Sequence, residues 1–230
     1  MIADTEYSRE NPSDFYKRCL EYYIQMHSTT KAFDGRSIKK FVFSIKTLIR
    51  DHHCKTLLDY GSGKATLYSD NFGLLTDIID HPLQEYWGLD KVFLYEPAIK
   101  GLRVLPPKPV DCVICTDVLE HIPPQDLHWV VDEMCSKATE FVFLNICTFP
   151  AMKVFPDGTN VHVSVFDQND WLTFLSRKRK NFEDLVIYVY FDVLESDETI
   201  SRAYKLDNYT PEHIDFKINR VEPLSIQGGI

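Results

Sequence analysis

The sequence lacks any apolar run that approaches the roughly 20 residues a helix needs to span a bilayer. Its first six residues are polar and acidic, unlike the basic and apolar start of a secretory signal. We therefore expect a cytoplasmic protein that has no membrane among its partners.

Positive charge is also scarce. The chain carries 25 Lys and Arg against 34 Asp and Glu, a formal net charge of -9 at pH 7. Such a protein has no broad electrostatic attraction to nucleic acid or to anionic membranes. We expect no nucleic acid duplex as a partner, although a small anion can still bind in a local pocket.

Repeats, low-complexity tracts and linkers are absent as well. The 230 residues, 44% of them hydrophobic and 13% aromatic, suit one globular domain with a large core. The six cysteines are scattered, which fits reduced and mostly buried thiols. Cys112 and Cys115 have a spacing that can bind zinc, but they lie in an apolar run that reads as a strand. Residues three apart on a strand point to opposite faces, so we expect no metal there or elsewhere in the chain.

Two nucleotide-binding loops are missing at the most prominent glycine turn, residues 61–64 (Gly-Ser-Gly-Lys). A phosphate loop needs a glycine five residues before its Gly-Lys pair and a hydroxyl after it, where this chain has Leu58 and Ala65. A dinucleotide fingerprint needs a third glycine where Thr66 stands. Both interpretations are therefore weak.

An acidic residue and a Gly-x-Gly turn remain, directly after a short buried strand at residues 56–58. A chain that leaves a parallel sheet in this way places a carboxylate and backbone N–H groups at the carboxyl end of the strand. Open α/β sheets bind ligands in that crevice. The glycines permit backbone conformations and a close ligand approach that a side chain would block.

Residues 57–63 (Leu-Leu-Asp-Tyr-Gly-Ser-Gly) resemble the first motif of the class I S-adenosylmethionine-dependent methyltransferases. Residues 117–123 (Asp-Val-Leu-Glu-His-Ile-Pro) are similar to the segment that these enzymes carry after their fourth strand. The two motifs and the strand–helix patterns around them cover residues 37–193. One departure is Ala65, where the family often has a third glycine.

The resemblance implies a three-layer α/β sandwich with a Rossmann-like, mostly parallel, seven-stranded sheet. It implies S-adenosylmethionine as cofactor and methyl transfer to a small-molecule acceptor. Residues 1–50 would form helices over the cofactor site, residues 51–193 the core, and residues 194–230 a last strand and tail. Two alternatives stay open: a non-catalytic protein that binds the cofactor, or another use of the cofactor such as its cleavage.

The resemblance also implies cofactor contacts in the glycine turn. Asp59 would hold the methionine part, directly or through water, and the following residues would let the backbone approach. Asp117 and Leu119 would line the floor of the cofactor site. The cofactor residues expected in the turn are Asp59, Tyr60, Gly61, Ser62 and Gly63.

The family usually has an acidic residue at the end of the second strand, about 20 residues beyond the first motif. Glu96 is the best candidate here, because it follows a clear apolar run at residues 92–95. Its carboxylate would accept hydrogen bonds from the two ribose hydroxyls. Asp80 and Asp90 are rivals at shorter spacing. Choosing Glu96 implies an insertion of roughly 15 residues, which we place at residues 71–86.

Three histidines are candidates for the acceptor side. His121 is a candidate general base, because an unperturbed imidazole has a pKa near neutrality. Alternatively, Glu120 and His121 shape the pocket without moving a proton. His27 and His162 are candidate substrate contacts, the latter in a loop at residues 147–165. The chain lacks the Asn-Pro-Pro or Asp-Pro-Pro run of enzymes that methylate exocyclic amines of bases.

The pattern also predicts the elements around these motifs. A first helix would begin at Asn11 as cap and Pro12 as first residue, and Ser37 would cap a second helix. Further strands are expected at residues 102–105, 110–116, 140–146 and 185–193, with a last antiparallel strand at residues 213–221.

Overall fold

The computed structural model describes residues 2, 6–29, 33, 35–69, 79, 81–196, 198–207 and 210–214. It contains a seven-stranded sheet with the order β2-β1-β3-β4-β5-β6-β7. Pairing is parallel from β2 to β5 and antiparallel for the last two pairs. The strands are β1 (Thr56–Tyr60), β2 (Lys91–Tyr95), β3 (Val110–Thr116), β4 (Ala138–Cys147), β5 (Val186–Glu195), β6 (Glu198–Leu206) and β7 (Glu212–His213).

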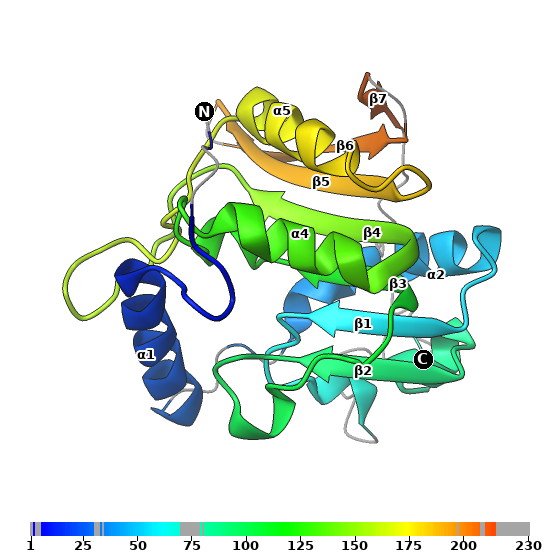
Figure 1. Cartoon of the computed structure of the whole chain (residues 1–230), viewed down its shortest axis with the longest axis horizontal. Coiled ribbons are helices and arrows are strands. Elements are labelled where there is room, and N and C mark those ends of the chain that lie inside the picture. The colour runs from blue at the N-terminus through cyan, green and yellow to red at the C-terminus, as the bar shows by residue number, and fades with distance from the viewer. Residues whose placement is uncertain are drawn as a thin grey trace, which may run out of the picture.

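Helices cover both faces of the sheet, which confirms the predicted three-layer α/β sandwich. The helices α4 (Leu127–Lys137) and α5 (Gln168–Arg179) pack on one face. The helices α2 (Val42–Asp51) and α3 (Leu83–Trp87) pack on the other. The first helix, α1 (Asp14–Thr29), lies beyond the carboxyl ends of the parallel strands (Figure 1). The arrangement is consistent with the class I methyltransferase type of fold.

The central strands are apolar on both faces, as buried parallel strands are. In β3, Val113 and Cys115 belong to the core beneath α4 and α5, whereas Cys112 and Ile114 belong to the core beneath α2 and α3. The sulfurs of Cys112 and Cys115 therefore lie on opposite faces, as their spacing predicts. All six cysteines are buried and free.

Both predicted helix starts are wrong. The helix α1 begins at Asp14, and its cap is Ser13, whose hydroxyl accepts a hydrogen bond from the Tyr16 N–H at 3.0 Å. The second helical segment begins with a 3₁₀ turn, Arg36–Phe41, after Gly35 in the left-handed conformation (φ 85°). Ser37 lies inside this turn, and its hydroxyl donates to the Thr116 carbonyl at 3.5 Å.

The predicted strand at residues 102–105 is also wrong. A 3₁₀ turn, Lys100–Leu102, stands at its start, held by a 2.8 Å hydrogen bond from the Glu96 N–H to the Leu102 carbonyl. At the other end of the chain, β6 was not predicted, and β7 begins one residue before the predicted last strand. Residues 215–221 of that prediction, and residues 71–78 and 80 of the predicted insertion, lie outside the described residues.

Within the described part of the chain, no helix is long and apolar enough to cross a membrane.

Candidate functional site

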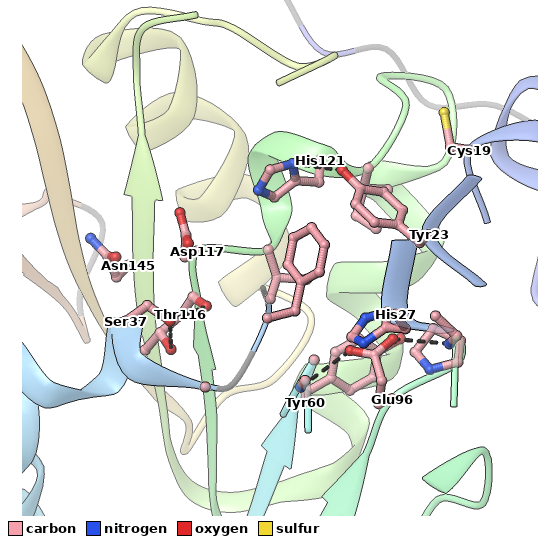
Figure 2. Close-up of a pocket in the computed structure, with 18 of the residues that line it drawn as sticks. Cys19, Tyr23, His27, Ser37, Tyr60, Glu96, Thr116, Asp117, His121 and Asn145 are labelled. Atoms are coloured by element: carbon pink, nitrogen blue, oxygen red, sulfur yellow. Dashed lines mark hydrogen bonds between the residues drawn. The ribbon is translucent and has the colours of Figure 1, made fainter. Parts of the chain in front are cut away.

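A cavity of about 640 Å³ lies at the carboxyl ends of the parallel strands, between the sheet and α1. This volume is in the range of small-molecule sites. Its walls come from α1, from the turns after β1, β2 and β3, and from the ends of β4 and β5. Figure 2 shows Tyr60 and Glu96 on one side of the cavity and Asp117 and His121 on the other.

The helix α1 closes the cavity because it packs against the β4–α5 loop (residues 148–167). Cys19 of α1 clusters with Phe155 and Val161 of this loop. The same face of α1 lines the cavity, through Tyr16, Cys19 and Tyr23. The predicted role of the N-terminal helices in shaping the pocket therefore has a structural basis in α1.

The glycine turn after β1 is required by its protein neighbours. Gly61 and Gly63 both have positive φ, 84° and 55°. A Cβ on Gly61 would lie 2.4 Å from a Val118 methyl, and one on Gly63 would lie 2.4 Å from the Phe33 carbonyl oxygen. Only glycine allows these close approaches in this conformation.

The N–H groups of this turn are already used within the protein. Those of Gly61 and Ser62 donate to the Tyr95 carbonyl at 2.8 and 3.1 Å, and that of Lys64 donates to the Phe33 carbonyl at 2.8 Å. The Gly63 N–H donates to Glu96 Oε2 at 3.2 Å. The turn therefore offers no row of free N–H groups for a phosphate, in agreement with the missing phosphate-loop residues.

Glu96 stands directly after β2 and lines the cavity. It is 9% exposed, and its two oxygens accept hydrogen bonds from the N–H groups of Gly63 and Ala98, the latter at 2.9 Å. Burial raises the pKa of Glu96, and these two bonds oppose that shift. A carboxylate has about four acceptor positions, so two remain for a ligand.

The rival carboxylates do not share this position. Asp90 is exposed and precedes β2, and Asp80 lies outside the described residues.

Asp59 is buried beneath the turn and is not part of the cavity wall. It is 5% exposed and accepts a 2.9 Å hydrogen bond from the Tyr68 hydroxyl. Burial raises the pKa of Asp59 to about 7, although the Tyr68 hydrogen bond lowers it. A direct contact of this carboxylate with a ligand in the cavity would therefore require its side chain to move.

The structure separates the predicted cofactor residues into two groups. The residues that line the cavity are Tyr60, Gly61, Gly63, Glu96 and Asp117. The residues that lie behind its wall are Asp59, Ser62 and Leu119, all three of them buried. Leu119 packs in the core under α4 and α5, and Val118 takes its place on the cavity wall.

Asp117 and His121 lie together on the wall after β3. Asp117 has a positive φ of 61°, and its N–H donates to the Asn145 carbonyl at 3.1 Å. His121 Nδ1 lies 2.9 Å from the Val161 carbonyl oxygen and 2.8 Å from the Tyr23 hydroxyl. Because a carbonyl only accepts, we assign the proton to Nδ1, which leaves a lone pair on Nε2.

The lowered pKa of His121 makes this residue a weak base in the free protein. Burial lowers the pKa of His121 to about 4, although the nearby Asp117 raises it. The imidazole is therefore neutral near pH 7, with an available lone pair but little affinity for a proton.

His162, in the β4–α5 loop, lies beside His121. The two ring centroids are 4.7 Å apart, and His162 Nδ1 is 2.7 Å from the Phe149 carbonyl oxygen. One ligand atom from each of Asp117, His121 and His162 lies within 4.8 Å of the others. No metal was expected from the sequence, in which His162 is far from the other two residues along the chain.

His27 lines the cavity from the carboxyl end of α1. Its ring packs on Phe33 with the centroids 5.0 Å apart, and its Nδ1 is buried without a hydrogen-bond partner among the described residues. Burial lowers the pKa of His27. The orphaned nitrogen is consistent with a polar contact from a bound molecule.

The sequence analysis also missed a polar group at the ends of β4 and β5. Asn145 donates to Asp192 Oδ2 at 3.2 Å, and Lys40 pairs with the same oxygen at 3.0 Å. All three residues line the cavity. A signal was present, since Asn145 and Asp192 interrupt apolar strands near their carboxyl ends.

The sequence matches no protein-family model and no curated protein. The likeness to class I methyltransferases therefore depends on the two motifs and on the fold. The sheet and the cavity at its carboxyl edge are compatible with S-adenosylmethionine binding.

Proposed function

We propose that the protein binds S-adenosylmethionine in this cavity and transfers its methyl group to a small-molecule acceptor. The observation that carries the proposal is Glu96, a carboxylate fixed on the cavity wall at the carboxyl end of β2, beside the glycine turn after β1. Ligands of open α/β sheets bind at this edge.

The residues present fit the cofactor. Glu96 keeps two acceptor positions, the number needed for the two ribose hydroxyls. Tyr60, Gly61 and Gly63 continue the same wall. Asp59, behind this wall, and Asp117, across the cavity, add carboxyl groups that would favour a positively charged ligand.

When bound, the cofactor supplies a methyl group on a positively charged sulfur that is already a good leaving group. The protein then contributes mainly by holding the acceptor in line with that methyl group. Enclosure by α1 and the β4–α5 loop serves this purpose, because it restricts the position of the acceptor and limits access of water.

The acceptor side of the cavity is polar. Asn145, Asp192 and Lys40 form one hydrogen-bonded group there, and His27 lines the cavity from α1. These groups favour a small acceptor that carries hydroxyl, amino or carboxylate groups. Proton removal by His121 stays a prediction, and its lowered pKa makes it a weak base.

Calorimetry with S-adenosylmethionine and with its demethylated product tests the cofactor. We expect both to bind the wild type, and Glu96→Gln to lower the affinity about 10-fold or more, because the amide loses one charged acceptor. Asp90→Asn is the matched control, since this exposed carboxylate lies outside the cavity, and it should bind normally. Equal binding by both variants, or no binding by the wild type, would contradict the proposal.

A screen with radiolabelled methyl groups then separates the three uses of the site. Transfer to an acceptor supports the enzyme. Cofactor binding without transfer to any acceptor favours a non-catalytic protein, and product analysis would reveal cleavage of the cofactor.

A further inference from the structure

Two histidines and a carboxylate converge at the cavity wall after β3, which Asp117 and His121 line. Asp117 and His121 come from the segment after β3, and His162 comes from the β4–α5 loop. One ligand atom from each lies within 4.8 Å of the others. Two ligand atoms bound to one cation at about 2.1 Å are roughly 3 to 4 Å apart, so side-chain shifts of about 1 Å would complete such a set.

Both imidazoles are fixed by a hydrogen bond from Nδ1 to a backbone carbonyl oxygen. His121 Nδ1–H donates to the Val161 carbonyl at 2.9 Å, and His162 Nδ1–H donates to the Phe149 carbonyl at 2.7 Å. Each ring therefore keeps the lone pair on Nε2. Metal-binding histidines are commonly fixed by such a hydrogen bond from the other ring nitrogen. In Figure 2 the His121 nitrogen bonded to Tyr23 faces away from Asp117, and the second ring nitrogen lies on the Asp117 side.

Glu120 provides an independent observation. Its side chain is fully buried, with 0% exposure, and Oε1 accepts a 2.8 Å hydrogen bond from the Cys147 N–H. Oε2 is buried without a hydrogen-bond partner among the described residues. A carboxylate oxygen of Glu120 lies within 4.8 Å of a ring nitrogen of His162. A buried carboxylate oxygen without a partner is costly, and a cation beside it removes that cost.

We propose that Asp117, His121 and His162 bind a divalent transition-metal cation, with the Glu120 carboxylate beside His162 adding negative charge next to the site. Imidazole and carboxylate ligands in this ratio suit Zn²⁺, Fe²⁺, Mn²⁺ or Co²⁺. Because Asp117 and His121 line the cavity, the cation would face it and could hold an oxygen atom of the acceptor, a role that rests on the proposed function. His121 would then be a metal ligand in place of a general base.

Cys147 gives the alternative ligand set with Glu120 and His162. Its thiol already donates to the Phe149 carbonyl, with the sulfur 3.6 Å from that oxygen. We therefore assign the cation to the oxygen and nitrogen ligands, and a thiolate contact becomes an outcome that the experiment detects.

The test is a Co²⁺ and Zn²⁺ titration of the full chain after removal of metals with a chelator. We expect one cation per chain, and at least a 10-fold loss of affinity in both His162→Gln and Asp117→Asn. His53→Asn is the control, because it removes an exposed imidazole at a positive φ that asparagine tolerates. Circular dichroism and urea unfolding would verify that each variant folds.

Several results would overturn the inference. They are the absence of stoichiometric binding by a folded wild type, equal affinities of His162→Gln and His53→Asn, or a Co²⁺ spectrum with a thiolate charge-transfer band that Cys147→Ser removes. Calorimetry with S-adenosylmethionine on the metal-free protein keeps the two proposals separate. Cofactor binding without metal binding would refute only the metal site, and metal binding without cofactor binding would refute only the proposed function.

Discussion

Asp59 should make the stability of the protein depend on pH in a way that one substitution can isolate. Its carboxyl is almost fully buried, and its described hydrogen-bond donor is the neutral Tyr68 hydroxyl at 2.9 Å. Burial raises its pKa from the ordinary value of 3.8 to about 7. Asp59→Asn keeps the shape and an acceptor oxygen but cannot ionise.

The sign follows from the direction of this shift. Because the folded-state pKa lies above the unfolded one, the protonated carboxyl stabilises the fold fully below about pH 4. That contribution is lost as the pH rises through about 7. A shift of about three pKa units corresponds to roughly 4 kcal/mol in total. Between about pH 5 and pH 8 the wild type should lose roughly 2–3 kcal/mol more than Asp59→Asn.

Urea unfolding of both proteins at several pH values measures this difference directly. The comparison cancels the contribution of other buried carboxyls, such as Glu96 and Glu120, which both proteins share. Tyr68→Phe is a second variant, and it should change the pH dependence of stability in the direction opposite to Asp59→Asn. It removes the hydrogen bond that favours the ionised form, so the loss of stability with rising pH should be larger than in the wild type.

Parallel stability curves for the wild type and Asp59→Asn over this range would refute the reasoning. They would mean that Asp59 ionises at its ordinary pKa, and that water or a cation reaches it.

Three further predictions concern the turns and the cap around the cavity. Ala65→Gly should raise the free energy of unfolding by about 0.5–1 kcal/mol in urea titrations, because Ala65 has a φ of 52° that costs alanine more than glycine. Gly63→Ala should lower it by about 2 kcal/mol or more and weaken cofactor binding in calorimetry, since its Cβ would meet the Phe33 carbonyl at 2.4 Å. Ser13→Ala should lower the melting temperature by several degrees, as the loss of a helix cap costs about 1 kcal/mol; an unchanged value would contradict that role.

The parallel strands of the sheet were predictable because each has a short apolar run of its own. Residues 112–115 in β3 are all apolar, and a strand covered by helices on both faces requires this pattern. The glycine turn was also predictable from a few adjacent residues, because its two glycines directly follow a short apolar strand. Positive φ confirms the predicted need for special backbone conformations, and the close neighbours that exclude a Cβ are Val118 and Phe33 of the protein itself.

Errors arose where tertiary contacts decide between similar local signals. Asn11 and Ser13 are both good caps, and Ser13 is selected because its N–H and hydroxyl also donate to the buried Asp126 carboxylate. The apolar residues at 102–105 lie beside a 3₁₀ turn, because the Glu96 N–H bonds back to Leu102 and sets Glu96 at the cavity wall. A strand there would compete with this contact.

The end of the cavity at Asp117 and His121 depends on contacts between segments that are distant in sequence, and no spacing rule reports them. His121 and His162 lie side by side because Ser164 attaches the β4–α5 loop to the segment after β3. The Ser164 N–H donates to the Glu120 carbonyl at 3.0 Å, and the Ser164 hydroxyl donates to the Ile122 carbonyl. The loop in turn supplies the Val161 carbonyl that fixes the tautomer of His121. The same few hydrogen bonds therefore close the cavity, orient one imidazole and bring the second imidazole beside it. Any chemistry at this end of the site requires that the loop stay attached to the segment after β3.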